Sequence, residues 1–221
     1  FFVTVVSLVL RKTTMRIRIT FSKQGALRYT GHLDLHKLWE RAARRAELPL
    51  AYSQGFHPQP KMSLAAALPL GFSSTCEVLD MRLERDFALD GLTEQLNETL
   101  PPGIRVTSIE QVDERAPALQ TQVVEAEYQV ELPEQADPSD LKRRIESALA
   151  SESILRERRG KKYDLRPLIE SLEAMDDKIV MLLAAREGAT GRPEEVLDVL
   201  GIAFEETRIE RTRLIFSPAK V

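Results

Sequence analysis

All histidines of the chain, His32, His36 and His57, fall in one short stretch of the sequence. Histidine is the side chain whose ordinary pKa lies closest to neutral pH, so it commonly transfers protons, binds metals or contacts phosphate. Lys61 follows closely, and a lysine can stabilise negative charge that develops during a reaction. We therefore predict that His32, His36, His57 and Lys61 are the candidate catalytic groups of this chain.

The residues around them predict a binding site for an anion. Apolar spacing indicates a helix that begins between Gly31 and Asp34, with Thr30 or Asp34 as N-cap, and free N–H groups at such an end favour a phosphate. We expect the loop that carries His57 and Lys61 to fold over this helix end. The predicted substrate-binding residues of this segment are Lys23, Arg28, Tyr29, His32, Asp34, Tyr52, His57 and Lys61.

Two other interpretations of the histidines stay open. In the first they are structural, with His36 solvated on its helix and His57 bonded to a backbone carbonyl. In the second, His32, His36 and a third histidine bind zinc, but the spacing matches no established zinc motif and no HExxH occurs. We therefore predict no metal ligands and no cofactor.

A second candidate is the basic segment "RERRGKKYDLR", residues 156–166. Dense positive charge beside a tyrosine suits an RNA backbone and an unpaired base; a solvated turn is the alternative. We expect this segment and the histidine segment to form one phosphate-lined surface. Its predicted binding residues are Arg158, Arg159, Lys161, Lys162, Tyr163, Asp164 and Arg166.

Composition narrows the function classes. Hydrophobic residues make up 43% and charged residues 29% of the 221 residues, as in ordinary globular proteins, which argues against wholesale disorder and against a membrane bundle. The formal net charge of -3 means that any binding of nucleic acid depends on local basic patches. Cys76 is the single cysteine, so the chain has no disulfide framework and no iron–sulfur motif, and we expect a reducing cytoplasm. P-loop, dinucleotide-binding and serine-hydrolase motifs are absent from the sequence.

The elements that must position these residues follow from hydrophobic periodicity. Period-two and helical stretches predict the order strand, helix, strand, strand, helix, strand twice over, including a strand at 48–53 and an insertion at 160–175 between two central strands. We predict an α+β fold of two tandem ferredoxin-like (βαββαβ) halves, antiparallel sheets with helices on one face. The predicted divisions are a non-core extension (1–14), a first half (15–113), a linker (114–121) and a second half (122–217).

Over residues 15–216 the chain resembles the radical SAM-linked protein family of bacteria. The resemblance implies an accessory role in RNA modification or processing, beside a separate cobalamin-binding radical SAM enzyme and often near ribonuclease E/G-type genes. Three blocks carry it: Phe21, Lys23, Gly25, Arg28, Tyr29, His32, Leu33, Asp34 and Leu35; then Tyr52, Ser53, Gly55, Phe56, Pro58, Pro60, Ser63, Leu68, Pro69 and Gly71; then Asp164, Arg166 and Pro167.

The leading hypothesis is an accessory protein that binds RNA or presents a substrate, without catalytic activity of its own and without a membrane partner. One alternative is a metal-independent RNA endonuclease, since tandem ferredoxin-like halves with histidine, tyrosine and lysine resemble the CRISPR repeat-cleaving endoribonucleases. The other is a protein-interaction module for the radical SAM enzyme.

Overall fold

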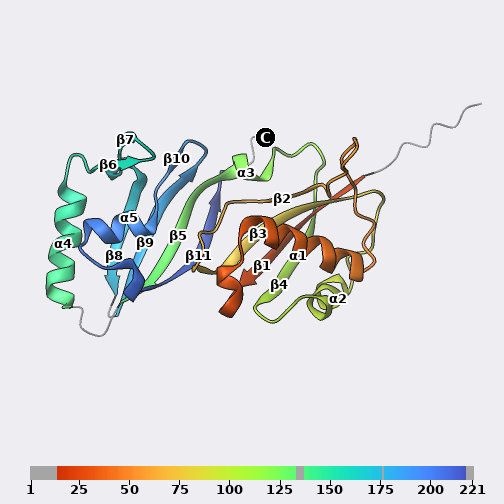
Figure 1. The fold of residues 1–221 in the computed structure, drawn as a ribbon, viewed down its shortest axis with the longest axis horizontal. Helices are drawn as coiled ribbons and strands as arrows, with labels where there is room; N and C mark the ends of the chain where they lie inside the picture. The colour runs from red at the N-terminus through yellow and green to blue at the C-terminus, as the bar shows by residue number, and fades with distance from the viewer. Residues whose placement is uncertain (1–13, 133–136, 176, 218–221) are drawn as a thin grey trace, which may run out of the picture.

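A computed structural model describes residues 14–132, 137–175 and 177–217 (Figure 1). The helices are α1 (His32–Arg45), α2 (Leu92–Thr99), α3 (Leu119–Gln122), α4 (Pro138–Ala150) and α5 (Pro193–Val199). Short 3-10 helices span Gly25–Tyr29, Arg166–Leu168 and Phe204–Glu206. The strands are β1 (Met15–Lys23), β2 (Met62–Leu64), β3 (Ser73–Leu83), β4 (Ile104–Val112), β5 (Val123–Glu131), β6 (Leu155–Arg158), β7 (Lys161–Asp164), β8 (Ile169–Met175), β9 (Lys178–Arg186), β10 (Ala189–Thr190) and β11 (Arg208–Phe216).

The fold is a mixed α+β fold around one large, mostly antiparallel sheet. Its strand order is β10-β9-β5-β11-β3-β1-β4, with β2 paired to β3 and β8 paired to β9. The pair β11–β3 is parallel and joins strands from the two halves of the chain at Ser73 and Ser74. The expectation of a separate sheet for each half is therefore wrong, because this short parallel seam makes the two sheets continuous.

In the first half, alternating apolar and polar residues explain how β1 packs against α1. In β1 the side chains of Ile17, Ile19 and Phe21 are fully buried, and the Phe21 ring lies 4.8 Å from that of Trp39 on α1, edge to face. Apolar residues at helical spacing place Trp39 on the buried side of α1, as predicted. These contacts hold α1 against the sheet.

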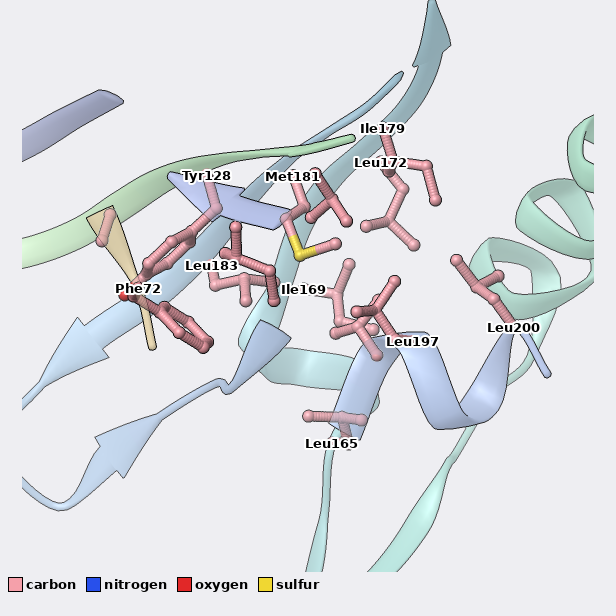
Figure 2. Close-up of a cluster of buried hydrophobic side chains, with 14 of the residues drawn as sticks. Phe72, Tyr128, Leu165, Ile169, Leu172, Ile179, Met181, Leu183, Leu197 and Leu200 are labelled. Atoms are coloured by element: carbon pink, nitrogen blue, oxygen red, sulfur yellow. The ribbon is translucent and has the colours of Figure 1, made fainter. Parts of the chain in front are cut away.

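The second half has its own core, and this core extends across the seam. Figure 2 shows leucines of α5 and of the segment after β7 packed on the strand residues Ile169, Met181 and Leu183. Phe72, at the start of β3, lies edge to face with Tyr128 of β5, with ring centroids 6.3 Å apart. Apolar packing thus ties the halves together at the same place as the parallel strand pair.

Three local predictions were wrong. Residues 48–53 form no strand and make only single bridges, Leu50 to Leu83 and Tyr52 to Pro60. The predicted insertion 160–175 contains β7 and β8, because Arg159 and Gly160 both have positive φ (51° and 76°) and form a tight turn that returns β7 along β6. The N-cap of α1 is Gly31.

Residues 1–13 of the predicted N-terminal extension lie outside the residues that the structure describes. Within the described residues, every helix is too short or too polar to cross a bilayer.

Candidate nucleic-acid interface

The basic segment forms the β6–β7 hairpin, which docks on α5. Arg158 donates to the Glu195 carboxylate at 2.6 Å, and Arg156 forms an ion pair with Asp198 at 2.8 Å. The Tyr163 hydroxyl also donates to Glu195. These contacts from two strands to one helix fix the hairpin in place.

A shallow pocket of about 350 Å³ opens between the hairpin and the start of α5. Four of its five lining residues are cationic. The turn at Arg159 and Gly160 and the start of α5 at Arg192 bring the backbone of these residues to one place, so their charges lie close together. The lining residues are Arg158, Arg159, Lys161, Tyr163 and Arg192; we call this site the hairpin pocket.

The cations of the hairpin pocket differ in whether they have partners. Burial raises the pKa of Glu195, but hydrogen bonds from Arg158 and Tyr163 outweigh it, so the pKa is lowered and the carboxylate neutralises Arg158. Arg159 and Lys161 are exposed, and no carboxylate of the described residues forms an ion pair with them. Arg192 forms a loose ion pair with Glu194, at 3.9 Å, and its charge also contributes to lowering the pKa of Glu195. The pocket therefore carries an excess of positive charge.

Other predicted residues of this segment have structural contacts. Arg166 donates to the carbonyl oxygens of Leu149, at 2.9 Å, and Ile169, at 3.1 Å. Asp164 accepts hydrogen bonds from the backbone N–H groups of Ile154 and Arg166, and the first of these contributes most to lowering its pKa. Lys162 is exposed but does not line the pocket.

The structure brings some of the predicted histidine site together at the start of α1. The His32 and His36 rings lie 4.9 Å apart, and burial, followed by the proximity of His32, lowers the pKa of His36. Arg28 donates to the Tyr29 hydroxyl at 2.7 Å and stacks on its ring. Asp34 is exposed beside Lys37, 3.7 Å away.

The expectation that the loop with His57 and Lys61 folds over the start of α1 is wrong. Tyr52, which leads into this loop, accepts hydrogen bonds from Arg44 and donates to Glu40, so the loop begins beside the second half of the helix. His57 is exposed on the loop. Lys61 lies beside Arg82 and lines a different cavity. The four candidate catalytic groups therefore do not form one site.

Lys23 was predicted to contact a substrate, but its side chain is 1% exposed. Its ammonium group donates to the carbonyl oxygens of Thr30, at 3.1 Å, and Arg28, at 3.4 Å. Burial lowers the pKa of Lys23, although the Glu77 carboxylate opposes this shift. In this conformation Lys23 supports the backbone ahead of α1.

Sequence analysis missed the charged residues at the seam. Arg211 on β11 and Glu77 on β3 are 1% and 2% exposed, and their closest atoms lie 2.5 Å apart. Arg211 also donates to the carbonyl oxygens of Ala66, at 3.1 Å, and Ala67, at 3.3 Å. The available signal was the position of Arg211 two residues after the buried Ile209 in a period-two strand.

The prediction that the histidine segment and the basic segment form one phosphate-lined surface is also wrong. The β6–β7 hairpin and α5 lie at one end of the long axis of the molecule, whereas α1 lies at the other, with β5, β11 and β3 between them (Figure 1). Within the described residues, no group of three His, Cys, Asp or Glu side chains is arranged to hold a metal ion.

A comparison with curated proteins gave no match. A family model described as "Uncharacterized protein conserved in bacteria (DUF2344)" matches residues 16–193. This match spans all of the first half and most of the second, including the β6–β7 hairpin. It does not link the chain to radical SAM enzymes, which the sequence resemblance had implied. The chain belongs to the bacterial DUF2344 family.

Proposed function

We propose that this protein is an accessory that binds RNA through the hairpin pocket and presents it to a partner. The observation that carries the proposal is the convergence of Arg159, Lys161 and Arg192 beside one pocket while a single carboxylate, Glu195, neutralises Arg158. A protein of net charge -3 gains no attraction for nucleic acid from its overall charge. Such a local excess is what phosphate binding requires in this case.

The contacts inside the pocket suggest how RNA is held. One face of the Tyr163 ring is covered by the Arg158 guanidinium, 4.8 Å from the ring centroid, and its hydroxyl is bonded to Glu195. Tyr163 therefore supports the arginine, and we assign phosphate contacts to Arg159, Lys161 and Arg192. Contacts of this kind depend on charge, so binding should show little sequence preference and a strong dependence on salt.

The test is fluorescence anisotropy with a labelled single-stranded RNA at 50 and 200 mM salt. For the natural sequence we expect binding that weakens steeply with salt, because counterions are released. The double variant Arg159→Glu/Lys161→Glu should weaken binding by about tenfold or more at the lower salt and reduce the salt slope by about 2. The matched control is Arg85→Glu/Arg115→Glu, which changes the same charge at two exposed residues, one in the first half and one in the segment that follows it.

Comparing the two variants separates the effect of charge at the hairpin from the effect of the protein's net charge. Equal loss in both variants would contradict a site at the hairpin, because it would show that only net charge matters. Absence of RNA binding by the natural sequence at 50 mM salt would overturn the proposal. Circular dichroism of each variant checks that the fold is intact.

The partner in this proposal is a separate cobalamin-binding radical SAM enzyme, on the strength of the sequence resemblance. A single cysteine, Cys76, lies in the chain, so these residues cannot form a three-cysteine iron–sulfur site. Burial raises the pKa of the Cys76 thiol to about 11, which does not favour a thiolate ligand. Pull-down of the purified enzyme with nuclease-treated protein tests the pairing, and no capture would count against it.

We also infer that each half is a ferredoxin-like unit. The pairings β4-β1-β3-β2 and β11-β5-β9-β8 are antiparallel throughout and have the same order within each half. In this interpretation the β6–β7 hairpin is an addition to the second unit, between its first helix and its second strand. A binding site on an added element would explain why only one of the two halves carries it.

A further inference from the structure

A groove with a volume of about 900 Å³ lies between α2 and β4. It is independent of the hairpin pocket and of the histidines. Helix α2 and β4 lie at the end of the molecule opposite to the hairpin (Figure 1). Leu100, Pro101, Pro102 and Ile104 are among its lining residues, and the acidic Glu94 and Glu98 lie on its helix side.

Beside this groove the sheet has a free edge. Among the described strands, β4 pairs with β1 on one side only. At Val106 the outer side of the strand is covered, because the Asn97 side chain accepts from the Val106 N–H at 2.8 Å and donates to its carbonyl at 3.1 Å. The amide of Asn97 thus bonds as the backbone of a neighbouring strand would. Helix α2 therefore lies against the edge of β4 at Val106.

From residue 108 to residue 112 no described strand pairs with the outer edge. Natural sheets protect long edges with charged residues, proline, bulges or a short strand. β4, "IRVTSIEQV", contains Arg105, Glu110 and a bulge at Thr107 but neither lysine nor proline, and residues 108–112 follow the bulge as regular strand. Such an edge is suited to pairing with another extended chain.

The two glutamates on the α2 side of the groove indicate the charge of the chain that would bind there. Glu94 and Glu98 are both exposed and four residues apart on α2, where like charges destabilise a helix. Glu98 also lies in the last turn, where the helix dipole disfavours a carboxylate. Neither forms an ion pair with a described residue. A positively charged ligand in the groove would reduce both the repulsion between the two carboxylates and the unfavourable interaction of Glu98 with the helix dipole.

We propose that the α2–β4 groove binds an extended, basic peptide segment of a partner protein, which adds to the free edge of β4 as a further strand. Backbone hydrogen bonds at residues 108–112 would supply affinity, and Lys or Arg side chains paired with Glu94 and Glu98 would supply specificity. The proposal does not depend on RNA binding at the hairpin.

The experiment is selection from a displayed library of random twelve-residue peptides against the whole protein, followed by binding measurements with the enriched peptides. We expect enriched peptides that are rich in Lys and Arg and that alternate with apolar residues. The variant Glu94→Gln/Glu98→Gln should weaken their binding about three- to tenfold, whereas Glu146→Gln/Glu152→Gln, at exposed positions of the second half, should not.

Hydrogen exchange identifies the binding mode. With an enriched peptide bound, amide protection should rise in residues 108–112, and proline at alternate peptide positions should abolish binding because it removes N–H donors. Failure to enrich peptides, equal affinity for the Glu94→Gln/Glu98→Gln variant, or protection confined to other strands would each overturn the proposal. A dimer that forms at micromolar concentration through β4, detected by sedimentation, would assign the edge to a second copy and would overturn it as well.

Discussion

The seam and the hairpin pocket both contain arginine, but its charge is neutralised at the seam and largely left free at the pocket. At the seam, Arg211 is buried and bonded to Glu77, to two backbone carbonyls and to Tyr128. At the hairpin, Arg159 and Lys161 are exposed and line an open pocket. The difference teaches that the number of basic residues in a segment does not measure the charge it offers to a ligand, which depends on how many of them lack a carboxylate partner.

The first way to test this contrast is to remove the cation at the seam. Arg211→Met leaves the Glu77 carboxylate buried without its partner, which should lower the free energy of unfolding by about 3–5 kcal/mol. Urea denaturation followed by circular dichroism measures this. The control is Arg213→Met on the same strand, whose exposed pair with Glu127 should contribute less than about 1 kcal/mol.

A double variant guards against a general packing effect. Glu77→Leu/Arg211→Met removes both charges, so most of the lost stability should return even though Arg211 is still absent. If the double variant is as unstable as the single one, the ion pair is not what matters, and the contacts of Arg211 with the loop carbonyls of Ala66 and Ala67 become the better explanation.

These regions also show what a sequence can predict. The strands β1 and β3 and helix α1 follow from local periodicity, since each half-buried strand alternates and α1 has one apolar face. The seam could not be predicted this way, because Glu77 and Arg211 are 134 residues apart and become partners only once β11 is known to lie beside β3. Period-two spacing places Arg211 on the face of the buried Ile209 and Glu77 on the face of the buried Leu79, but it does not show that the two side chains neutralise each other.

The site was predictable only in part, for a similar reason. The density of basic residues at 156–166 indicated the hairpin surface, and the structure places Arg159, Lys161 and Tyr163 there. It could not show that Arg166 turns inward to Leu149, or that Arg192 from α5 joins the pocket. Proximity along the chain likewise suggested one histidine site, whereas the bonds of Tyr52 to α1 carry the His57 loop away from His32.

The second prediction sharpens the contrast at the hairpin. Glu195→Gln removes the carboxylate that neutralises Arg158, so RNA affinity at low salt should rise a few-fold while stability falls by about 1 kcal/mol or less, since the pair is partly exposed. Anisotropy and urea denaturation measure the two effects. Glu170→Gln, which breaks the exposed pair with Arg186, is the control and should leave RNA affinity unchanged. A fall in affinity would show that Glu195 is needed to position Arg158 and Tyr163.

The smallest effect on stability is expected at the His32–His36 pair, which lies outside both the seam and the hairpin pocket. Burial and the neighbouring His32 lower the pKa of His36 in the folded protein below its ordinary value of 6.5. As pH falls through that value, the unfolded chain takes up a proton that the folded chain resists, so stability should decrease toward acid pH. In His36→Gln this decrease should be shallower, as measured by thermal or urea unfolding between pH 5 and about pH 8. His57→Gln, a change at an exposed loop position, should keep the slope of the natural sequence. If both variants flatten the curve equally, the burial of His36 and its neighbour His32 do not account for the loss of stability toward acid pH.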